Sequence, residues 1–442
     1  MARLRAGTAT ANLTPPVGAF LAGFASRTRP CEGIHDDLLA RALVVEADGQ
    51  RLALVSCDLI GLTTESVASI RKMAEKAAGV PAPSIFVACT HTHSGPTTGV
   101  LRHPGLDLEF VHVVEKKVAG AIAEAASNLA DAALAVGRGR ARIGVNRRQR
   151  QPDGSTALGK NPEGPTDPDV AVVRVDGPGG RPLAIVACHA CHPVVLAGGN
   201  YLVSADFPGR LAAFVEGVFP GCRCLFFNGG CGDINPVVVG GTFEDASRLG
   251  RFLGAEVVKV AEGLSPRPEA VVETSSRAVE VPLAPLPSAE EARATIEERT
   301  RVLEEQLASG AISREVAEAD WERGWAREVM SEYGKPDRLR ALSLELMGVR
   351  LGNAALIGMP GEVFVEIALA VKNAAPLQPT AVVSYANGVV GYIPTARAFE
   401  EGGYEVERAH KFYRGVYAFT PEIEKIVTDG AVEVANRLAA LS

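Results

Sequence analysis

Short apolar segments of strand length recur along the chain, and segments with apolar side chains at helical spacing lie between them. The predicted strands are Ala42–Glu46, Leu52–Cys57, Ile85–Cys89, Val170–Val175, Leu183–Cys188, Cys224–Asn228, Val279–Val281, Ala354–Met359 and Ala381–Tyr385. The predicted helices are Thr64–Ala78, Leu108–Ala130, Pro208–Val218 and Ala246–Gly263. This alternation predicts an α/β fold of the mixed α+β kind, with helices flanking mixed sheets.

Two segments depart from this pattern. Ser288–Glu332 is rich in Glu, Arg and Ala, contains no strand-like run and has a Ser-Gly break near Gly310, so we expect an inserted helical hairpin, with a partner-binding arm as the alternative. Arg147–Asp169 is rich in Pro, Gly and Asn, which predicts a long ordered loop. Because no repeat or linker interrupts the chain, we expect residues 1–442 to form a single domain, large enough to be a catalytic one.

Composition and charge exclude several classes of protein. The chain has 45 Lys and Arg against 52 Asp and Glu, a net charge of -7, which disfavours a nucleic-acid partner and leaves a small-molecule substrate as the expectation. No apolar window is long enough for stable membrane insertion. The N-terminal apolar stretch is broken by Asn12, Pro15 and Pro16, which predicts a cytoplasmic protein with reduced, buried cysteines. The oligomeric state stays open, a homo-oligomer included.

Four of the eight histidines fall in two short clusters. The first, Thr90-His91-Thr92-His93-Ser94-Gly95-Pro96, directly follows the apolar segment Ile85–Cys89. Alternate residues of a strand share a face, so we expect His91 and His93 to project together. Two adjacent imidazoles suit a metal ligand beside a base or a second ligand, and satisfied polar packing is the alternative.

The second cluster is Cys188-His189-Ala190-Cys191-His192-Pro193. Its spacing matches a c-type haem attachment sequence, but that chemistry needs export, which the N-terminal segment does not predict. A structural zinc site from Cys188, Cys191, Cys222 and Cys224 is a second alternative, although Cys188 and Cys191 would point to opposite faces of a strand. We favour His192, at the strand end, as a metal ligand.

The order of these motifs resembles the neutral/alkaline non-lysosomal ceramidase family, along nearly all of that family's catalytic domain. The histidine-containing sequence from Thr90 to Pro96 is the most specific part of the resemblance. The other matching sequences are Gly33-Ile34-His35, Ala40-Arg41-Ala42, Ser56-x-Asp58, Asn146-Arg147, His192 followed by Ser204-x-Asp206, Gly232-Asp233-Ile234-x-Pro236, Pro360-Gly361-Glu362 and Tyr392-Ile393-x-Thr395.

The resemblance implies a mixed α/β catalytic domain that holds one zinc ion (Zn2+) per chain. The ligands it implies are His91, His192, Glu362 and Tyr392. Zinc in such a site lowers the pKa of a bound water to about 7. His93 matches a histidine that handles protons, and Arg147 and Tyr404 match an arginine and a second tyrosine of the site. We also expect two carboxylates to orient the ligand imidazoles, namely Asp206 and Asp233.

The sequence departs from the family in three respects. Asn235 stands where ceramidases carry a serine, no C-terminal immunoglobulin-like domain is expected, and no signal peptide is predicted. We therefore predict a zinc-dependent hydrolase that cleaves an amide (C–N) bond in a small or mildly lipophilic molecule, with His93, Arg147, Tyr404 and Asn235 in catalysis. The alternatives are a true ceramidase or N-acyl-lipid amidase, an ester or lactone hydrolase, and a non-catalytic metal- or ligand-binding protein.

Overall fold

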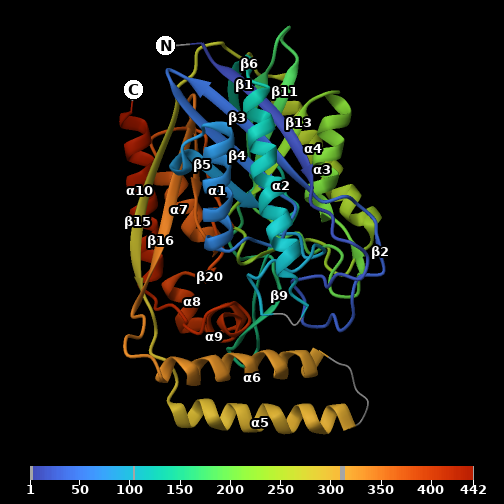
Figure 1. Cartoon of the computed structure of the whole chain (residues 1–442), viewed down its shortest axis with the longest axis vertical. Coiled ribbons are helices and arrows are strands. Elements are labelled where there is room, and N and C mark those ends of the chain that lie inside the picture. Colours follow the sequence, from blue (N-terminus) through green and yellow to red (C-terminus); the bar gives the residue numbers. More distant parts are fainter. Residues whose placement is uncertain (1–2, 103–104, 309–313, 442) are drawn as a thin grey trace.

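The computed structural model describes residues 3–102, 105–308 and 314–441, and its body is built on three large sheets (Figure 1). The first has the strand order β5-β4-β3-β1-β6 and contains β1 (Arg5–Asn12), β3 (Leu39–Ala47), β4 (Gln50–Cys57), β5 (Ile85–Cys89) and β6 (Ala130–Asp131). The second, β13-β11-β10-β7, contains β7 (Ala133–Arg140), β10 (Asp169–Asp176), β11 (Pro182–His189) and β13 (Arg223–Asn228). The third, β15-β16-β17-β19, contains β15 (Val272–Pro282), β16 (Ala341–Leu351), β17 (Ala354–Gly358) and β19 (Thr380–Val383).

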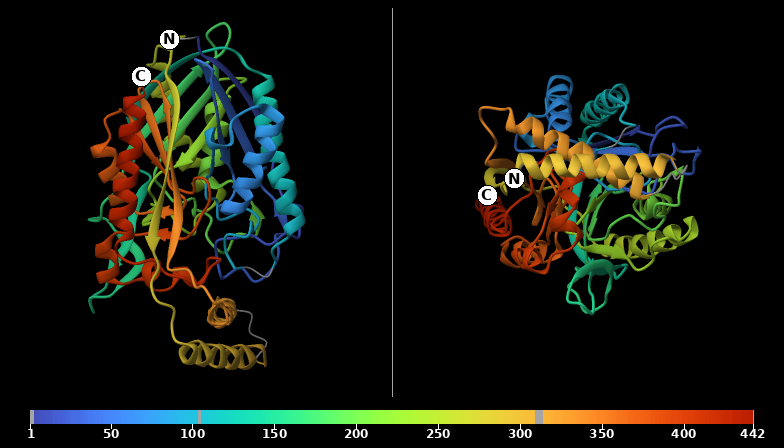
Figure 2. Two further views of the ribbon diagram at one scale, coloured as in Figure 1. Left: turned by 60° about the vertical axis from the view of Figure 1, so that its left-hand side comes forward. Right: turned by 90° about the horizontal axis from the view of Figure 1, so that it is seen from below.

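The three large sheets share a core, and a pair of helices covers the outer face of each. Phe86, Phe227 and Met347, one from each sheet, belong to the same buried cluster. The covering pairs are α1 (Thr64–Ala78) with α2 (Leu108–Ser127), α3 (Asp206–Val218) with α4 (Phe243–Glu262), and α7 (Val365–Ala374) with α10 (Ile423–Ala440). Seen from below, these helices lie around the outside of the sheets (Figure 2). The predicted mixed α+β fold is therefore confirmed.

Local sequence signals set the ends of several elements. The Thr63 hydroxyl accepts a hydrogen bond from the Ser66 N–H at the start of α1, and Gly79 ends the helix with a φ of 62°. Thr242 and Asp245 form a reciprocal capping box at the start of α4. Strands are present at all the predicted positions, and most differ from the prediction only by small shifts at their ends. The exception is Val279–Val281, which is the last part of the much longer β15 (Val272–Pro282).

The predicted loop over Arg147–Asp169 is wrong in part. Residues 147–150 and 156–161 of this segment belong to β8 (Gly144–Arg150) and β9 (Thr156–Asn161), which join β14 (Ile234–Pro236) in a three-stranded sheet. Backbone pairing, rather than burial of an apolar face, holds these two strands together. Polar and glycine residues are therefore compatible with the strand conformation here. Two small parallel pairs complete the sheets of the described residues: β2 (Gly33–Ile34) with β12 (Leu202–Val203), and β18 (Glu362–Val363) with β20 (Tyr392–Ile393).

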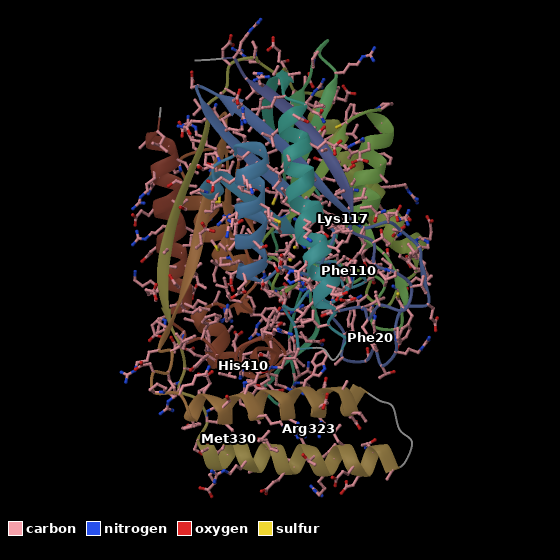
Figure 3. All side chains as sticks on the ribbon, viewed as in Figure 1. Phe20, Phe110, Lys117, Arg323, Met330 and His410 are labelled. Atoms are coloured by element: carbon pink, nitrogen blue, oxygen red, sulfur yellow. The ribbon has the colours of Figure 1, made fainter. Side chains whose placement is uncertain are left out.

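The Glu-, Arg- and Ala-rich segment forms two helices that lie against one another, α5 (Ala289–Ala308) and α6 (Arg314–Tyr333). Ser288 and Glu291 form the capping box that starts α5. Arg323 and Met330 lie between the two helices, and His410 of the body lies beside α6 (Figure 3). The break predicted near Gly310 lies outside the described residues.

Short helices lie between the third sheet and this hairpin: α8 (Ala396–Glu401), α9 (Tyr404–Glu407) and η2 (Ala409–Lys411), while η1 (Ala82–Ser84) precedes β5. Trp325 of α6 packs edge-on against His410, and its indole N–H donates to the Val416 carbonyl at 3.0 Å. These contacts fix α6 to the body of the molecule. Among the described residues, we find no helix that combines the length and the apolar character needed to cross a bilayer.

Candidate functional site

The candidate site lies beyond the carboxyl ends of parallel strands. Each large sheet contains a parallel pair, β4–β5 in the first, β11–β13 in the second and β17–β19 in the third. His91 follows β5, His192 follows β11 and Glu362 follows β17 after a short turn. The three sheets thus each deliver one candidate ligand to a common point, at the strand ends where α/β proteins generally place their sites.

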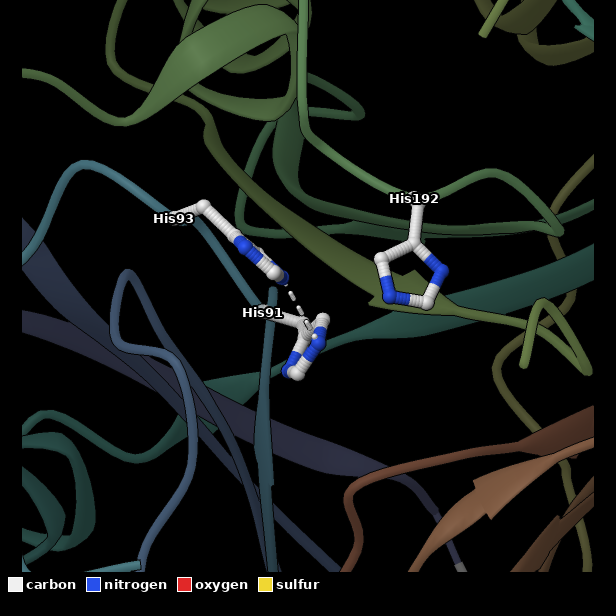
Figure 4. Close-up of side chains that lie close together, drawn as sticks. All are labelled: His91, His93 and His192. Carbon is white, nitrogen blue, oxygen red and sulfur yellow. Dashed lines mark hydrogen bonds between the residues drawn. The ribbon is translucent and has the colours of Figure 1, made fainter. Parts of the chain in front are cut away.

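The first histidine cluster reaches this point through a turn. β5 ends at Cys89, and His91 has a φ of 69°, so the expected alternation along a strand is wrong for this pair. The turn nevertheless brings the two rings together, with 3.1 Å between the Nε2 atoms of His91 and His93 (Figure 4). A non-glycine residue in the left-handed region is strained, and such residues concentrate at functional sites.

Backbone carbonyls hold the two candidate ligand histidines in one tautomer. Nδ1 of His91 lies 2.5 Å from the Ile60 carbonyl, and Nδ1 of His192 lies 2.7 Å from the Cys231 carbonyl. A carbonyl oxygen only accepts hydrogen bonds, so each Nδ1 carries the hydrogen and each Nε2 presents a lone pair to the site.

The expectation that Asp206 and Asp233 orient these imidazoles is wrong. Asp206 accepts hydrogen bonds from the N–H groups of Leu196 and Phe207. Asp233 accepts from the Val365 N–H and from the Asn146 side chain. Both carboxylates therefore hold the loops that carry the site, because buried N–H groups in loops need acceptors.

Two tyrosines that the sequence analysis did not assign to the site hold Glu362. Tyr413 donates to Oε1 of Glu362, and Tyr385 donates to Oε2 at 3.3 Å. The Tyr385 ring also stacks on His91, with 3.9 Å between centroids and planes 8° apart. Tyr385 belongs to the sequence YANGVVGY, whose two tyrosines were a sequence signal for a functional role. No motif surrounds Tyr413.

A buried arginine links the predicted tyrosine ligand to a carboxylate that the sequence analysis missed. Arg147 donates to the Tyr392 hydroxyl at 2.8 Å and to Glu405 Oε1 at 2.9 Å. It also donates to the Asn235 side-chain carbonyl at 3.4 Å. Arg148 holds the other oxygen of Glu405 at 2.8 Å, so the carboxylate lies between two guanidinium groups. Glu405 adjoins Tyr404 in sequence, which was the only available signal.

Burial controls the protonation of the site. Burial, then the neighbouring His91 and His192, hold the pKa of His93 well below its usual 6.5, so its imidazole is neutral at pH 7 and can accept a proton. Burial also raises the pKa of Tyr392 well above 10, and Arg147 only partly opposes this shift. Tyr392 therefore keeps its proton at neutral pH in the metal-free site.

A cavity of about 660 Å³ opens onto the site. It is within the size range of pockets that enclose drug-sized ligands. His192 is fully buried behind this surface, 3.0 Å from Glu362 Oε2. The other predicted site residues all line the cavity: His91, His93, Arg147, Asn235, Glu362, Tyr392 and Tyr404.

The donor atoms fit a small divalent cation. Glu362 Oε2 lies 3.0 Å from His192 Nε2 and 3.5 Å from His91 Nε2. Ligands at 2.0–2.1 Å from a tetrahedral ion are separated by roughly 3.3–3.4 Å. His192 Nε2 is buried and has no hydrogen-bond partner among the described residues. Its lone pair faces a carboxylate, an arrangement that a cation between them would stabilise.

Two donor sets share this position. The first is His91, His192 and Glu362, with Tyr392 next to Glu362 in the register of β18 and β20. The second is His91, His93 and His192, whose candidate ligand nitrogens all lie within 4.8 Å of one another. The choice between them decides whether His93 binds the metal or remains free to transfer protons.

Comparison with known proteins identifies relatives of this fold and sequence. The family model described as "Neutral/alkaline non-lysosomal ceramidase, N-terminal" matches residues 4–252. Neutral ceramidases of Drosophila pseudoobscura pseudoobscura and Drosophila melanogaster are each 26% identical over 269 residues, which cover 54% of this chain. The chain spans only 37% of the length of these two relatives.

Solved structures of low sequence identity share the fold. The crystal structure of neutral ceramidase from Pseudomonas aeruginosa matches with a TM-score of 0.74 and 20% identity, over 100% of this chain and 75% of that one. A ceramidase complexed with C2 matches with the same TM-score of 0.74 and 18% identity, over 100% of this chain and 76% of that one. The fold likeness thus extends beyond residue 252, where the family model ends.

Proposed function

The chain belongs to the neutral/alkaline non-lysosomal ceramidase family, and we propose that it is a zinc-dependent hydrolase that cleaves an amide bond in a small or mildly lipophilic substrate. In this proposal residues 1–442 act as one catalytic domain. The observation that supports it best is the pair of histidines, His91 and His192, whose Nδ1 atoms are fixed by backbone carbonyls and whose Nε2 atoms face Glu362.

His91, His192 and Glu362 would hold the metal, with Tyr392 as the fourth protein ligand. A divalent metal at this position supplies Lewis acidity, which polarises a substrate carbonyl and lowers the pKa of water. Tyr385 and Tyr413 fix the Glu362 carboxylate by donating to its two oxygens. These donors orient the carboxylate toward the two histidines.

His93 is the proposed proton carrier. Its neutral imidazole lines the cavity beside His91, in reach of a water that attacks the carbonyl carbon. In the first step Nε2 or Nδ1 accepts the proton of that water as the C–O bond forms, and in the second the same proton passes to the leaving amine as the C–N bond breaks. The reaction is balanced as amide plus water giving carboxylic acid and amine.

Arg147, Tyr404 and Asn235 are the proposed donors to the developing oxyanion. All three line the cavity, and Arg147 is held in place by Glu405 and by the Asn235 carbonyl oxygen. Because that oxygen accepts from Arg147, the NH2 group of Asn235 can donate to substrate. One such donor contributes about 3–4 kcal/mol to the stability of the transition state.

Metal analysis combined with a substrate screen tests the proposal. We expect purified protein to contain one zinc ion per chain and to hydrolyse N-acyl amides, and we expect His192→Ala to lose both. His112→Ala, at an exposed position on α2, is the matched control and should keep both. A wild-type protein that cannot be loaded with zinc would contradict the metal site. A zinc-loaded protein that cleaves esters or lactones but no amide would contradict the bond type.

Replacement of Gly23 by alanine is expected to lower kcat/KM by about 10²-fold, because a displacement of about 1 Å in a catalytic group has effects of this size. A Cβ atom on Gly23 would lie 2.3 Å from Nδ1 of His93, so the imidazole must move. Gly18 provides the control, since its φ of 98° matches the 99° of Gly23 but no atom of the residues that the structure describes lies within 4 Å of the added Cβ. If steady-state assays show the same loss of kcat/KM for Gly18→Ala and Gly23→Ala, the effect comes from backbone strain and not from displacement of His93.

A further inference from the structure

The α5–α6 hairpin is inserted at the tip of a complete pair of strands. β15 and β16 pair without interruption until Pro282 lies opposite Ala341, so the chain leaves the sheet and returns to it at neighbouring positions. No residue of the proposed metal site lies between these two positions. The insertion is therefore not needed to align β15 with β16, which raises the question of its role.

The hairpin lies against the body over the substrate cavity. In Figures 1 and 2 the two helices lie outside the sheets, at the end opposite the chain termini. Glu318 of α6 pairs with Arg408 at 2.9 Å, and Glu328 pairs with Arg102. Trp321 lies between these two glutamates in sequence, is 8% exposed, and lines the cavity. Acidic residues of α6 thus meet basic residues of the body, and the aromatic side chain of Trp321 between them forms part of the cavity lining.

A series of aromatic rings connects the proposed metal site to this helix. The Tyr392 ring contacts Tyr404 with 5.9 Å between centroids, and Tyr404 stacks on Phe412 at 6.1 Å. Phe412 in turn contacts Trp321 edge-on at 5.3 Å. All four side chains line the same cavity. They form a continuous aromatic wall that begins at a proposed ligand and ends on the inserted hairpin, and aromatic faces suit apolar chains.

We propose that Trp321 is a specificity-determining residue that closes the far end of the cavity and limits the length of the apolar chain of the substrate. The inference rests on the proposed amide hydrolysis and concerns the length of apolar chain that the cavity admits, with that chain lying along the aromatic wall. Chains that reach beyond Phe412 meet the indole of Trp321. The hairpin thus provides selectivity, while the strand ends of the three large sheets provide the chemistry.

The turnover test compares chain lengths. We would measure kcat/KM for N-acyl amides of one amine with saturated acyl chains of increasing length, in the wild type, Trp321→Ala and Trp325→Phe. The ratio of the longest to the shortest substrate is expected to rise at least about tenfold in Trp321→Ala, because small changes in a hydrophobic pocket have effects of this size. Trp325→Phe should leave that ratio within about twofold, since the ring at position 325 packs against His410 outside the cavity lining and the pairs Glu318–Arg408 and Glu328–Arg102 still hold α6 to the body. An unchanged ratio in a folded Trp321→Ala protein would overturn the proposal.

A binding test separates this inference from the proposed reaction. The chain has two tryptophans, both on α6, so Trp325→Phe leaves Trp321 as the sole indole fluorophore. Decanoate, a product-like carboxylate, is expected to shift or quench the emission of this variant with saturation, whereas Trp321→Phe, which keeps Trp325, should respond weakly. A saturable response without turnover of any amide supports the cavity wall and contradicts the proposed function. Decanoate binding detected by calorimetry without a change in Trp321 emission, or no decanoate binding, would overturn the proposal.

Discussion

Replacement of His93 by alanine is expected to lower kcat by roughly 10²- to 10⁴-fold, the usual contribution of a positioned general acid–base group, while the protein keeps its zinc. The reason is the position of His93, whose neutral imidazole lines the cavity beside the proposed ligands. Zinc content by mass spectrometry and steady-state kinetics on the same preparation provide the two measurements.

His91→Ala is the matched comparison, because it removes the neighbouring imidazole of the same turn. That variant should lose zinc together with activity, since His91 Nε2 faces Glu362 at 3.5 Å. If His93→Ala loses zinc to the same extent as His91→Ala, then the three-histidine donor set is correct. In that case His93 is a ligand, and proton transfer must be assigned to another group.

Replacement of Arg147 by methionine is expected to lower kcat/KM by roughly 10²- to 10³-fold, the range seen when one oxyanion donor is removed. The change removes the guanidinium from the cavity and from the Tyr392 hydroxyl. It should also destabilise the protein by about 3–5 kcal/mol, because Glu405 stays buried with only one of its two cationic partners. Arg147→Lys should recover little activity, since an ammonium cannot reproduce the three-way contact of the planar guanidinium.

Arg148→Met distinguishes chemistry from stability. Arg148 holds the other oxygen of Glu405, but within the described part of the chain it contacts neither Tyr392 nor Asn235, and it does not line the cavity at the site. Denaturant unfolding should therefore show similar losses of stability for the two variants. Kinetic assays on folded protein should show a large loss of activity for Arg147→Met alone. Comparable activity losses in both variants would mean that Arg147 acts only through the structure.

The candidate site was predicted from sequence to the extent that its residues fall in short, distinctive motifs. His91 and His93 are two positions apart, and His192 and Glu362 each follow an apolar strand, so their proximity to strand ends was predictable. Tyr413 and Glu405 could not be found in this way. Tyr413 reaches Glu362 across 51 positions, and Glu405 reaches Arg147 across 258, through loops without periodic patterns.

Two local predictions failed because contacts between distant segments overrode the local sequence preference. Parts of the polar segment that was expected to be a loop belong to β8 and β9, since strands can pair through the backbone without an apolar face. Asp206 and Asp233 hold N–H groups of loops, while the carbonyls of Ile60 and Cys231 orient the imidazoles. Every residue has a backbone carbonyl, so sequence gives no indication of which one meets a histidine.

By itself the sequence determined the position of the strands with pronounced apolar runs, the mixed α+β class, the family and the set of residue types that can bind a metal. These properties depend on side-chain chemistry and on periodicity along a short stretch of chain, which the order of residues contains directly. Only the tertiary structure decided which donors face one another, which tyrosines hold Glu362, and that the α5–α6 hairpin contributes Trp321 to the cavity. Those relations depend on contacts between segments that are distant in sequence, and such contacts are set by the packing of the three sheets around their common core.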